Sequence, residues 1–330
     1  MMEKLIRRPR TATRKAPVRE YFFDEEKPLP CVIEASDQDV NLAQWLRQNA
    51  ETTERKLLRY GAVLFRNFGV TNIREFEEVS RSLGEELLNY DFASTPRTAL
   101  KEKVYTSTEY PADQEIIMHN EMAYSKKWPE KLWFYCHQPP TAGGETPLVD
   151  SRRLYGRIGA ETKEAFEKHG LLYVRNYHEN LDLAWEEVFQ TTSRDEVEHY
   201  CQEHGIDYQW IDNHHLQTRE RCPAVLSHPA TQEKSWFNQA HLFHVSNLAD
   251  EIKNTLLTLL DEAMVPRNVY LGNGAPIEGE ALDAIRALYS EEKVVFSWQK
   301  NDVLLVDNIL VAHGRHPYRG DRKIVVAMTH

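Results

Sequence analysis

The chain has 330 residues, of which 41% are hydrophobic and 28% are charged, and its formal net charge at pH 7 is −11. This length allows one large domain or two ordinary ones, and the apolar fraction is sufficient for a sizeable core. The acidic balance argues against nucleic-acid binding, and no apolar stretch approaches the roughly 20 residues of a membrane span. Four cysteines without a C-x-x-C pair argue against a disulfide framework. We therefore expect a cytoplasmic protein that binds neither nucleic acid nor membranes.

The N-terminus carries a basic stretch between Arg7 and Arg19. No apolar segment follows this stretch, so it is not a secretory signal. Residues 1–30 are predicted to form a flexible tail, and a docking arm for an acidic partner is the alternative interpretation. The sequence leaves the oligomeric state open.

Helical patterns dominate the chain up to residue 83. Residues 38–60 carry an apolar stripe and stop at Gly61, which predicts a helix, and residues 62–65 then predict a buried strand. Residues 73–83 predict a second helix, because Asn72 can cap its first turn and apolar residues recur along one face. We expect these helices to cover a β core.

From residue 103 onward, short strand patterns replace the helical ones. Strands are predicted at residues 132–136, 146–149, 224–226, 236–237, 294–298, 303–306 and 324–328, and further helices at 160–169 and 249–264. Residues 178–220 are rich in charge and histidine and resemble an insertion, in which Ser193 and Glu196 predict the start of a helix that ends near Gly205. The whole pattern predicts a mainly β protein with flanking helices, of the α+β class, with a single domain over residues 31–330.

Two segments that are far apart in the sequence carry candidate metal ligands. In an extended strand, residues two positions apart point to the same side, so His119 and Glu121 would face one way and Asn120 the other. His313 lies near the end of another extended segment, and a β barrel or sandwich can bring it to the first pair. Two imidazoles and one carboxylate form the facial triad that binds iron(II). Alone, the H-x-E pattern is weak evidence, and a hydrogen-bonded histidine in a loop is the ordinary alternative.

Arg322 and Thr146 are candidates for binding an anion beside this metal. If the segments that flank the glycine-containing turn after His313 pair as a hairpin, Arg322 lies next to His313, where its guanidinium can hold a carboxylate with two hydrogen bonds. Thr146 follows two adjacent glycines, and its hydroxyl can join the same carboxylate. Such a site suits 2-oxoglutarate, whose other end chelates iron. A surface arginine and an ordinary turn are the alternatives.

Taken as a set, these motifs resemble the taurine/2-oxoglutarate dioxygenase (TauD/TfdA) family. The matching segments are His119-Asn120-Glu121, Gly143-Gly144-Glu145-Thr146-Pro147-Leu148, Asp307-Asn308, His313-Gly314-Arg315 and Gly320-Asp321-Arg322. Residues 61–66, 105–110 and 236–239 further resemble the SyrP-like branch, which belongs to syringomycin biosynthesis. The resemblance covers residues 30–330.

This resemblance implies a double-stranded β-helix core, also called a jelly roll or cupin-like fold. It implies a dioxygenase that uses iron(II), 2-oxoglutarate and O2, with His119, Glu121 and His313 as catalytic metal ligands and with Thr146 and Arg322 binding 2-oxoglutarate. Many relatives have aspartate at the carboxylate position. Relatives often have a second arginine directly after Arg322, where this chain has lysine, so only the first guanidinium is carried over.

The resemblance also limits the substrate. It implies hydroxylation of an unactivated C–H bond in an amino acid, either free or tethered to a peptidyl carrier protein, in natural-product biosynthesis. Glu121 favours hydroxylation over halogenation, because related halogenases have a small residue there, although desaturation or ring closure needs no different triad. Candidate substrate-binding residues are Arg315, Asn238, Gln239 and Arg66, with structural ion pairs as the alternative for the two arginines. Residues 178–220 are a candidate lid or a solvated excursion.

Two alternatives come from other classes of protein. A zinc hydrolase can use two histidines and one glutamate with a bound water. A non-catalytic β-sandwich binding module would leave the metal ligands without a purpose.

Overall fold

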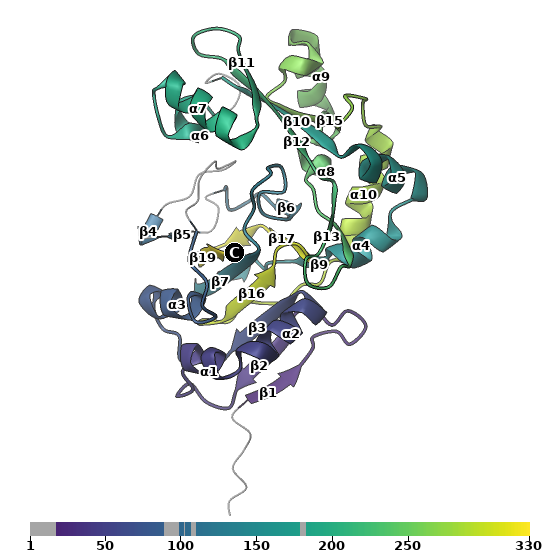
Figure 1. Ribbon diagram of the computed structural model, residues 1–330. Helices are drawn as coiled ribbons and strands as arrows, with labels where there is room; N and C mark the ends of the chain where they lie inside the picture. Colours follow the sequence, from purple (N-terminus) through teal and green to yellow (C-terminus); the bar gives the residue numbers. More distant parts are fainter. Residues whose placement is uncertain (1–17, 89–98, 102, 107–109, 179–182) are drawn as a thin grey trace, which may run out of the picture.

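A large β-sheet and a small β-sheet face each other at the centre of the molecule (Figure 1). The computed structural model describes residues 18–88, 99–101, 103–106, 110–178 and 183–330. The large sheet has eight strands in the order β1 (Val18–Tyr21), β2 (Cys31–Ala35), β3 (Ala62–Arg66), β16 (Val303–Asp307), β7 (Lys131–Gln138), β19 (Lys323–Thr329), β5 (Val104–Thr106) and β4 (Ala99–Lys101). The small sheet consists of β6 (Ile116–His119), β17 (Val311–Arg315) and β9 (Leu148–Asp150).

Alternating residues of the large sheet face two different apolar clusters, since successive side chains of a strand point to opposite faces. Leu64, Phe134 and Val326 share a buried cluster with Leu148 and Val311 of the small sheet. The intervening residues share a second cluster with helices α1 (Leu42–Gln48), α2 (Ala50–Tyr60) and α3 (Ile73–Ser80). The large sheet is therefore buried on both faces, which explains the uninterrupted apolar runs of its central strands.

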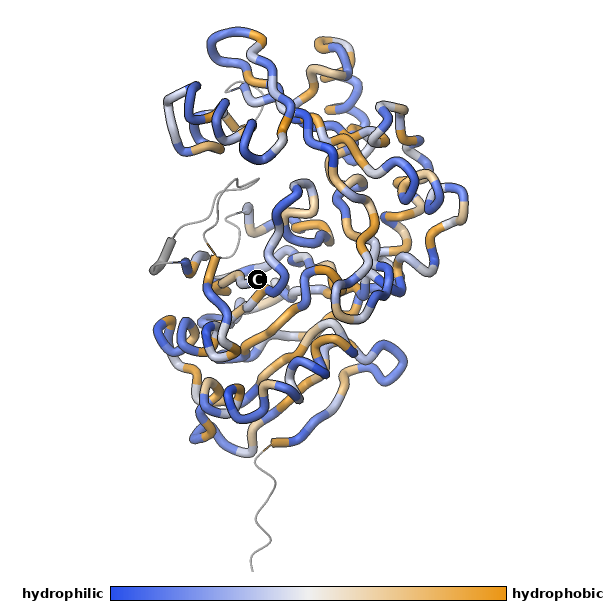
Figure 2. The backbone as a smooth tube through the Cα atoms, in the orientation of Figure 1, coloured by the Kyte–Doolittle hydropathy of each residue, from blue (hydrophilic) through white to orange (hydrophobic). Residues whose placement is uncertain are grey.

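A four-stranded sheet with several helices forms the other half of the molecule and occupies the upper part of Figure 1. Its strands are β11 (Asp207–Trp210), β12 (Leu216–Cys222), β10 (Leu171–Tyr177) and β15 (Arg267–Leu271), and two short pairs are β13 (Val225–Ser227) with β14 (Lys234–Trp236) and β8 (Ala142–Gly143) with β18 (Tyr318–Arg319). The helices are α4 (Ser151–Arg157), α5 (Ala160–His169), α6 (Trp185–Phe189), α7 (Arg194–His204), α8 (Ala240–Phe243), α9 (Asp250–Leu259) and α10 (Gly279–Glu292). Figure 2 shows hydrophobic residues along the sheet strands and hydrophilic residues on loops and outward helix faces.

The mixture of strands and covering helices confirms the predicted α+β class. The two predicted helix caps are also present, because the Asn72 side chain accepts a hydrogen bond from the Glu75 amide and Ser193 accepts one from the Glu196 amide. The predicted helix over residues 38–60 is instead two helices, α1 and α2. Asn49 separates them, with its side-chain amide donating to the Trp45 carbonyl at 2.8 Å and its φ at −122°.

The predicted strand at residues 294–298 is wrong. Its side chains alternate between buried and exposed as in a strand, with Phe296 and Trp298 in the cluster between the sheets. Among the described residues, however, only Val294 pairs, through an isolated bridge to Leu148. The alternation of buried and exposed residues shows that one side of this extended segment is buried. An extended segment can be buried in this way without pairing with a neighbouring strand.

Two predicted segment boundaries also differ from the structure. The described chain begins at Val18 with β1, which pairs with β2 from Val18 opposite Ala35 to Tyr21 opposite Val32, so residues 18–21 of the predicted tail belong to the large sheet. Residues 1–17 of the predicted tail lie outside the described residues. The segment 178–220 contains α6 and α7 but also β11 and most of β12, which are strands of the four-stranded sheet. In the part of the chain that the structure describes, no helix is long and apolar enough to cross a membrane.

Arg66 is held in a buried ion pair at the end of β3. Its Nη2 donates to Asp302 Oδ2 at 2.7 Å, its Nε donates to Asp302 Oδ1 at 3.1 Å, and the two side chains are 7% and 1% exposed. A third hydrogen bond goes from Nη2 to the carbonyl oxygen of Ser297. This geometry supports the structural alternative for Arg66 over the substrate-binding one.

We expect Arg66→Met to lower the free energy of unfolding by about 3–5 kcal/mol, because it leaves Asp302 buried without its partner. Arg47 is the matched control, since it pairs with Glu78 at 2.9 Å with side chains 52% and 55% exposed. Arg47→Met should change the unfolding free energy by less than about 1 kcal/mol. Urea denaturation of the two variants measures both values, and equal losses would contradict a structural role for Arg66.

Candidate metal and co-substrate site

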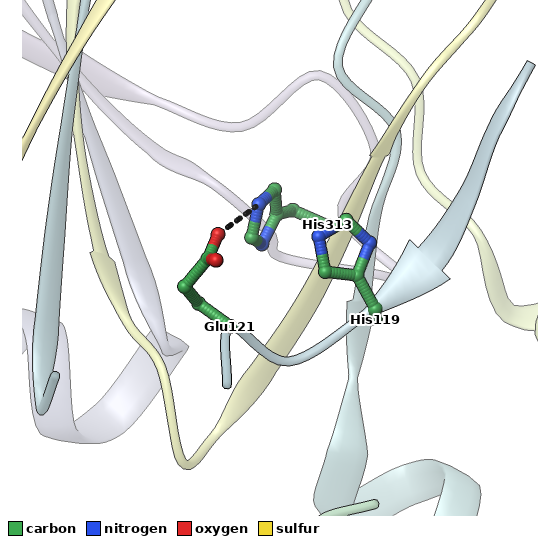
Figure 3. Close-up of side chains that lie close together, drawn as sticks. All are labelled: His119, Glu121 and His313. Atoms are coloured by element: carbon green, nitrogen blue, oxygen red, sulfur yellow. Dashed lines mark ion pairs between the residues drawn. The ribbon is translucent and has the colours of Figure 1, made fainter. Parts of the chain in front are cut away.

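The small sheet places two histidines directly opposite each other. In the antiparallel pairing of β17 with β6, His313 is the partner of His119. Glu121 follows two residues after His119, and one ligand atom from each of the three residues lies within 4.8 Å of the others (Figure 3). The distance from His313 Nε2 to Glu121 Oε2 is 4.0 Å, which is too long for a hydrogen bond but spans a metal ion bound by both at about 2.1 Å.

Glu121 reaches this position through a turn and not through strand alternation, so that part of the sequence argument is wrong. Strand β6 ends at His119, and the turn that follows contains Met122 at a φ of 56°. Asn308 fixes the turn: its Oδ1 accepts from the Glu121 amide at 2.7 Å, and its Nδ2 donates to the Glu121 carbonyl at 2.9 Å. The side chain of Asn120 donates to the Asn308 carbonyl at 2.6 Å and stays out of the ligand cluster.

Two further side chains hold the backbone between the ligands. Gln239 Nε2 donates to the Asn120 carbonyl at 2.8 Å. The backbone N–H of Gln239 donates to the Tyr173 hydroxyl of β10, also at 2.8 Å. His241 Nε2 donates to the Met118 carbonyl at 2.9 Å. Burial lowers the pKa of His241 to about 3, so this imidazole is neutral at physiological pH. Asn308 and His241 were not predicted as supporting residues, because their role depends on backbone atoms that a sequence pattern does not show.

The predicted substrate residues Asn238 and Gln239 are both buried and occupied with backbone groups. Asn238 Nδ2 donates to the Ala224 carbonyl at 2.8 Å, and its Oδ1 accepts from the Ala240 amide at 3.0 Å. Within the described residues, neither side chain lines the cavity beside the histidines. These contacts support a role in shaping the ligand loop.

The three ligands fit a divalent iron ion. His119 Nδ1 lies 2.8 Å from the Ile117 carbonyl. A hydrogen bond donated by Nδ1 to this carbonyl leaves Nε2 as the ligand atom that faces the cluster. His313 and Glu121 are buried, at 5% and 4% exposure, so a bound ion would be shielded from most of the solvent. Two imidazoles and one carboxylate on one side leave further coordination positions open.

A small cavity of about 30 Å³ lies beside the two histidines and is lined by residues of both sheets. Its lining includes His119 and His313 together with Thr146 and Arg322, so the structure brings these four predicted residues together. Thr146 Oγ1 accepts from Trp298 Nε1 at 3.0 Å, and Arg322 Nε donates to the Gly144 carbonyl at 3.0 Å. Burial and the nearby Arg315 lower the pKa of Arg322 to about 10, so this cation would be stabilised by an anion bound beside it.

Arg322 does not reach the histidines through a hairpin, so the predicted pairing is wrong. Strand β17 pairs with β6 and β9, whereas β19 pairs with β7 and β5 in the opposite sheet. Arg322 therefore enters the cavity from the facing sheet. Gly144, with a φ of 70°, gives it space, because a Cβ there would lie 3.0 Å from Arg322 Cδ.

Arg315 also lines the cavity, but its guanidinium is bound to a loop. Nη1 donates to the Tyr110 carbonyl at 3.0 Å, and Nη2 donates to the carbonyls of Pro111 and Gln114 at 2.6 and 2.8 Å. That loop leads directly into β6. Arg315 is therefore suited to holding the strand that carries His119.

A β core that presents two histidines and a carboxylate next to a half-buried arginine is the architecture of a non-haem metal-dependent oxygenase. Residues 25–329 match the family described as Taurine catabolism dioxygenase TauD, TfdA family. The dapdiamide synthesis protein DdaC of Enterobacter agglomerans is 38% identical over 301 residues, which cover 91% of each chain. A clavaminate synthase-like protein of Arabidopsis thaliana is 30% identical over 333 residues, covering 95% of this chain and 97% of that one.

The chain therefore belongs to the TauD/TfdA family and is a 2-oxoglutarate-dependent dioxygenase, with iron(II), 2-oxoglutarate and O2 as its cofactors. The fold agrees with this family. The solved structure of the PvcB protein from Pseudomonas aeruginosa has a TM-score of 0.56 and 13% identity, over 97% of this chain and 93% of that chain. The predicted jelly-roll core is confirmed.

We expect Asn308→Asp to weaken iron(II) binding by about 10- to 100-fold, because it removes the hydrogen bonds that Nδ2 donates to the Glu121 and Pro129 carbonyls. Asn176 is the matched control. It is also buried and donates two hydrogen bonds to backbone carbonyls, those of Ala263 and Val265. Titration of the metal-free protein with iron(II) under anaerobic conditions measures both variants. An equal loss of affinity in Asn176→Asp would show a general effect on stability.

Proposed function

We propose that His119, Glu121 and His313 bind iron(II), that Thr146 and Arg322 hold 2-oxoglutarate, and that the enzyme hydroxylates an unactivated C–H bond of an amino-acid-like substrate. The observation that supports this most directly is the single cavity shared by His119, His313, Thr146 and Arg322. Iron and 2-oxoglutarate together supply the oxidising power for this chemistry. The protein orients the co-substrate, holds the C–H bond in place and excludes water.

Each part of the cavity suits one end of 2-oxoglutarate. The half-buried guanidinium of Arg322 can bind the distal carboxylate, with the Thr146 hydroxyl as a second donor. The histidines at the other end leave metal positions open for the keto acid. The buried apolar walls, such as Phe134 and Val326, keep water from the reacting groups.

The relatives support a small-molecule substrate from a biosynthetic pathway. DdaC is named for dapdiamide synthesis, and PvcB is described as an Fe, alpha-ketoglutarate dependent oxygenase from an isonitrile synthetic pathway. Glu121 fills the carboxylate position, which supports hydroxylation over halogenation. The same cofactors can also support desaturation or ring closure. The four buried free cysteines are consistent with the expected cytoplasmic location.

A zinc hydrolase would explain the three metal ligands but not the arginine that lines the same cavity. Zinc sites of this kind need only an open position for water. Arg322 and Thr146 line the same cavity as the two histidines, and this supports the oxygenase over the hydrolase.

We expect the wild-type protein to release succinate from 2-oxoglutarate only with iron(II) and O2, and His119→Ala to lose this activity because it removes a ligand. His169 is the control, since it lies at the end of α5 outside the ligand cluster. A screen of free amino acids, followed by the same acids as carrier thioesters, measures succinate by mass spectrometry. Hydrolysis with zinc and no succinate would support the hydrolase instead.

Arg322→Lys should raise the KM for 2-oxoglutarate by about 10-fold or more, because an ammonium cannot make the paired hydrogen bonds of a guanidinium. Arg319 lies three residues earlier, on β18, and is exposed, so Arg319→Lys should leave the KM unchanged. Initial rates of succinate release at varied 2-oxoglutarate test both variants. An unchanged KM in Arg322→Lys would place the co-substrate elsewhere.

A further inference from the structure

A second, much larger cavity lies beside the metal site. Its volume is about 810 Å³, and it opens between the end of β19, the loop after Glu121 and helices α6 and α7. In Figure 1, α6 and α7 lie above the C-terminus, which is marked near the centre of the view. Residues that define its walls include Leu88, Met122, Lys127, Trp128, Tyr200 and Met328.

The large cavity and the small cavity lie one after the other along the same face of β19. Ile324 and Val326 line the small cavity, and Met328 lines the large one, which are positions i, i+2 and i+4 of one strand. The ligand segment shows the same order, because His119 lines the small cavity and Met122 the large one. Glu121 lies between these two residues in the sequence, and the two histidines line the small cavity but not the large one, so the metal site lies near the junction on the side of the small cavity.

The two cavities differ so much in volume that they must bind different molecules. The small cavity has about 30 Å³ of free space, so its side chains must separate to admit even the co-substrate, and a second molecule cannot share it. The large cavity is within the range of roughly 300–1,000 Å³ that is typical of ligand pockets. Its volume of about 810 Å³ is far more than a free amino acid would fill.

The walls of the large cavity combine apolar surface with charged side chains of both signs. Trp128, Met122 and Leu88 offer apolar contacts, Lys103 and Lys127 are cations, and Glu86 and Glu196 are carboxylates. Lys127 is exposed, whereas Lys103 is half-buried. Lys127 Nζ lies 3.1 Å from His204 Nε2. His204 Nδ1 lies 2.8 Å from the Tyr200 carbonyl, which suits a proton on Nδ1 and leaves Nε2 to accept from Lys127. The ammonium then keeps two other N–H groups, and among the described residues no carboxylate pairs with it.

We propose that the large cavity is the substrate chamber and that the substrate is an amphipathic carboxylic acid of dipeptide size or larger, with its carboxylate held by Lys127. Its apolar body lies against Trp128 and Met122 and directs the reacting carbon toward the junction at Glu121. This inference rests on the proposed function. It favours an untethered substrate, because a thioester to a carrier protein consumes the carboxylate that Lys127 would bind.

The test uses the full-length protein with iron(II) and 2-oxoglutarate. Substrate-stimulated succinate release is measured with free amino acids, N-acylated amino acids, dipeptides, the methyl esters of the last two groups, and aminoacyl carrier thioesters. We expect N-acylated amino acids or dipeptides to stimulate release, free amino acids to stimulate it little, and the methyl esters to have a KM about 10-fold higher. Stimulation that is equal for free amino acids, or greatest for the carrier thioesters, would overturn the proposal.

A pair of neighbouring lysines supplies a matched control. Lys126 is exposed like Lys127 and donates to the Gly205 carbonyl at 2.7 Å at the same end of α7, but it is not among the lining residues. Lys127→Gln should raise the KM for the acid about 10-fold with kcat nearly unchanged, and should not alter the KM for the methyl ester. Lys126→Gln should behave as wild type. Equal effects of the two variants would overturn the assignment of Lys127.

The same assay separates failure of this inference from failure of the proposed function. Anaerobic binding of iron(II) and 2-oxoglutarate gives a charge-transfer absorption band that depends on the metal and co-substrate and not on Lys127. If the band forms in the wild type and in both lysine variants but the acids do not stimulate succinate release, the chamber assignment is wrong and the cofactor chemistry stands. If the wild type gives no band and no succinate, the proposed function itself fails.

Discussion

The antiparallel pairing of β6 with β17 is the constraint on which the site depends. It places His119 opposite His313 although the sequence separates them widely, and it fixes their side chains on the face that looks toward the large sheet. The large sheet lies on the opposite side of the cavity and contributes its apolar residues, such as Phe134 and Val326, and the adjoining Arg322. The metal ligands and the anion-binding arginine therefore come from opposing sheets. The distance between the sheets, set by the packing of residues such as Phe134 and Val326, determines whether one molecule can reach both.

Polar side chains hold the ligand segment at its backbone. Asn308, Gln239 and His241 each hydrogen-bond to a backbone group between Met118 and Glu121, and each of the three is buried. These hydrogen bonds fix the backbone position of Glu121 and leave its carboxylate available for a metal ion. A buried turn of this kind would otherwise leave backbone groups unpaired, which is costly in a core. The same contacts explain why several polar residues near the site are not available to bind a substrate.

The sequence allowed the chemistry of the site to be predicted better than the path of the chain. His119, Glu121, His313, Thr146 and Arg322 are candidates from residue type and spacing, the resemblance to the TauD/TfdA family selects them, and the structure brings them to one place. The predicted strand alternation and hairpin are both wrong, since Glu121 lies on a turn and Arg322 lies beside a strand of the other sheet. Both depend on long-range pairing, which alternation and turn residues do not specify. Local signals such as the caps at Asn72 and Ser193 were predicted correctly, because they depend only on neighbouring residues.

The backbone N–H of Gln239 donates a hydrogen bond to the Tyr173 hydroxyl, and this bond connects the two halves of the molecule. Tyr173 belongs to the four-stranded sheet, and through Gln239 it is connected to the carbonyl between the first two ligands. The jelly roll thus does not contain all that its metal site needs. A fragment reduced to the two facing sheets would keep every ligand but lose the support that orients them. The four-stranded sheet is in this sense an integral wall of the active site.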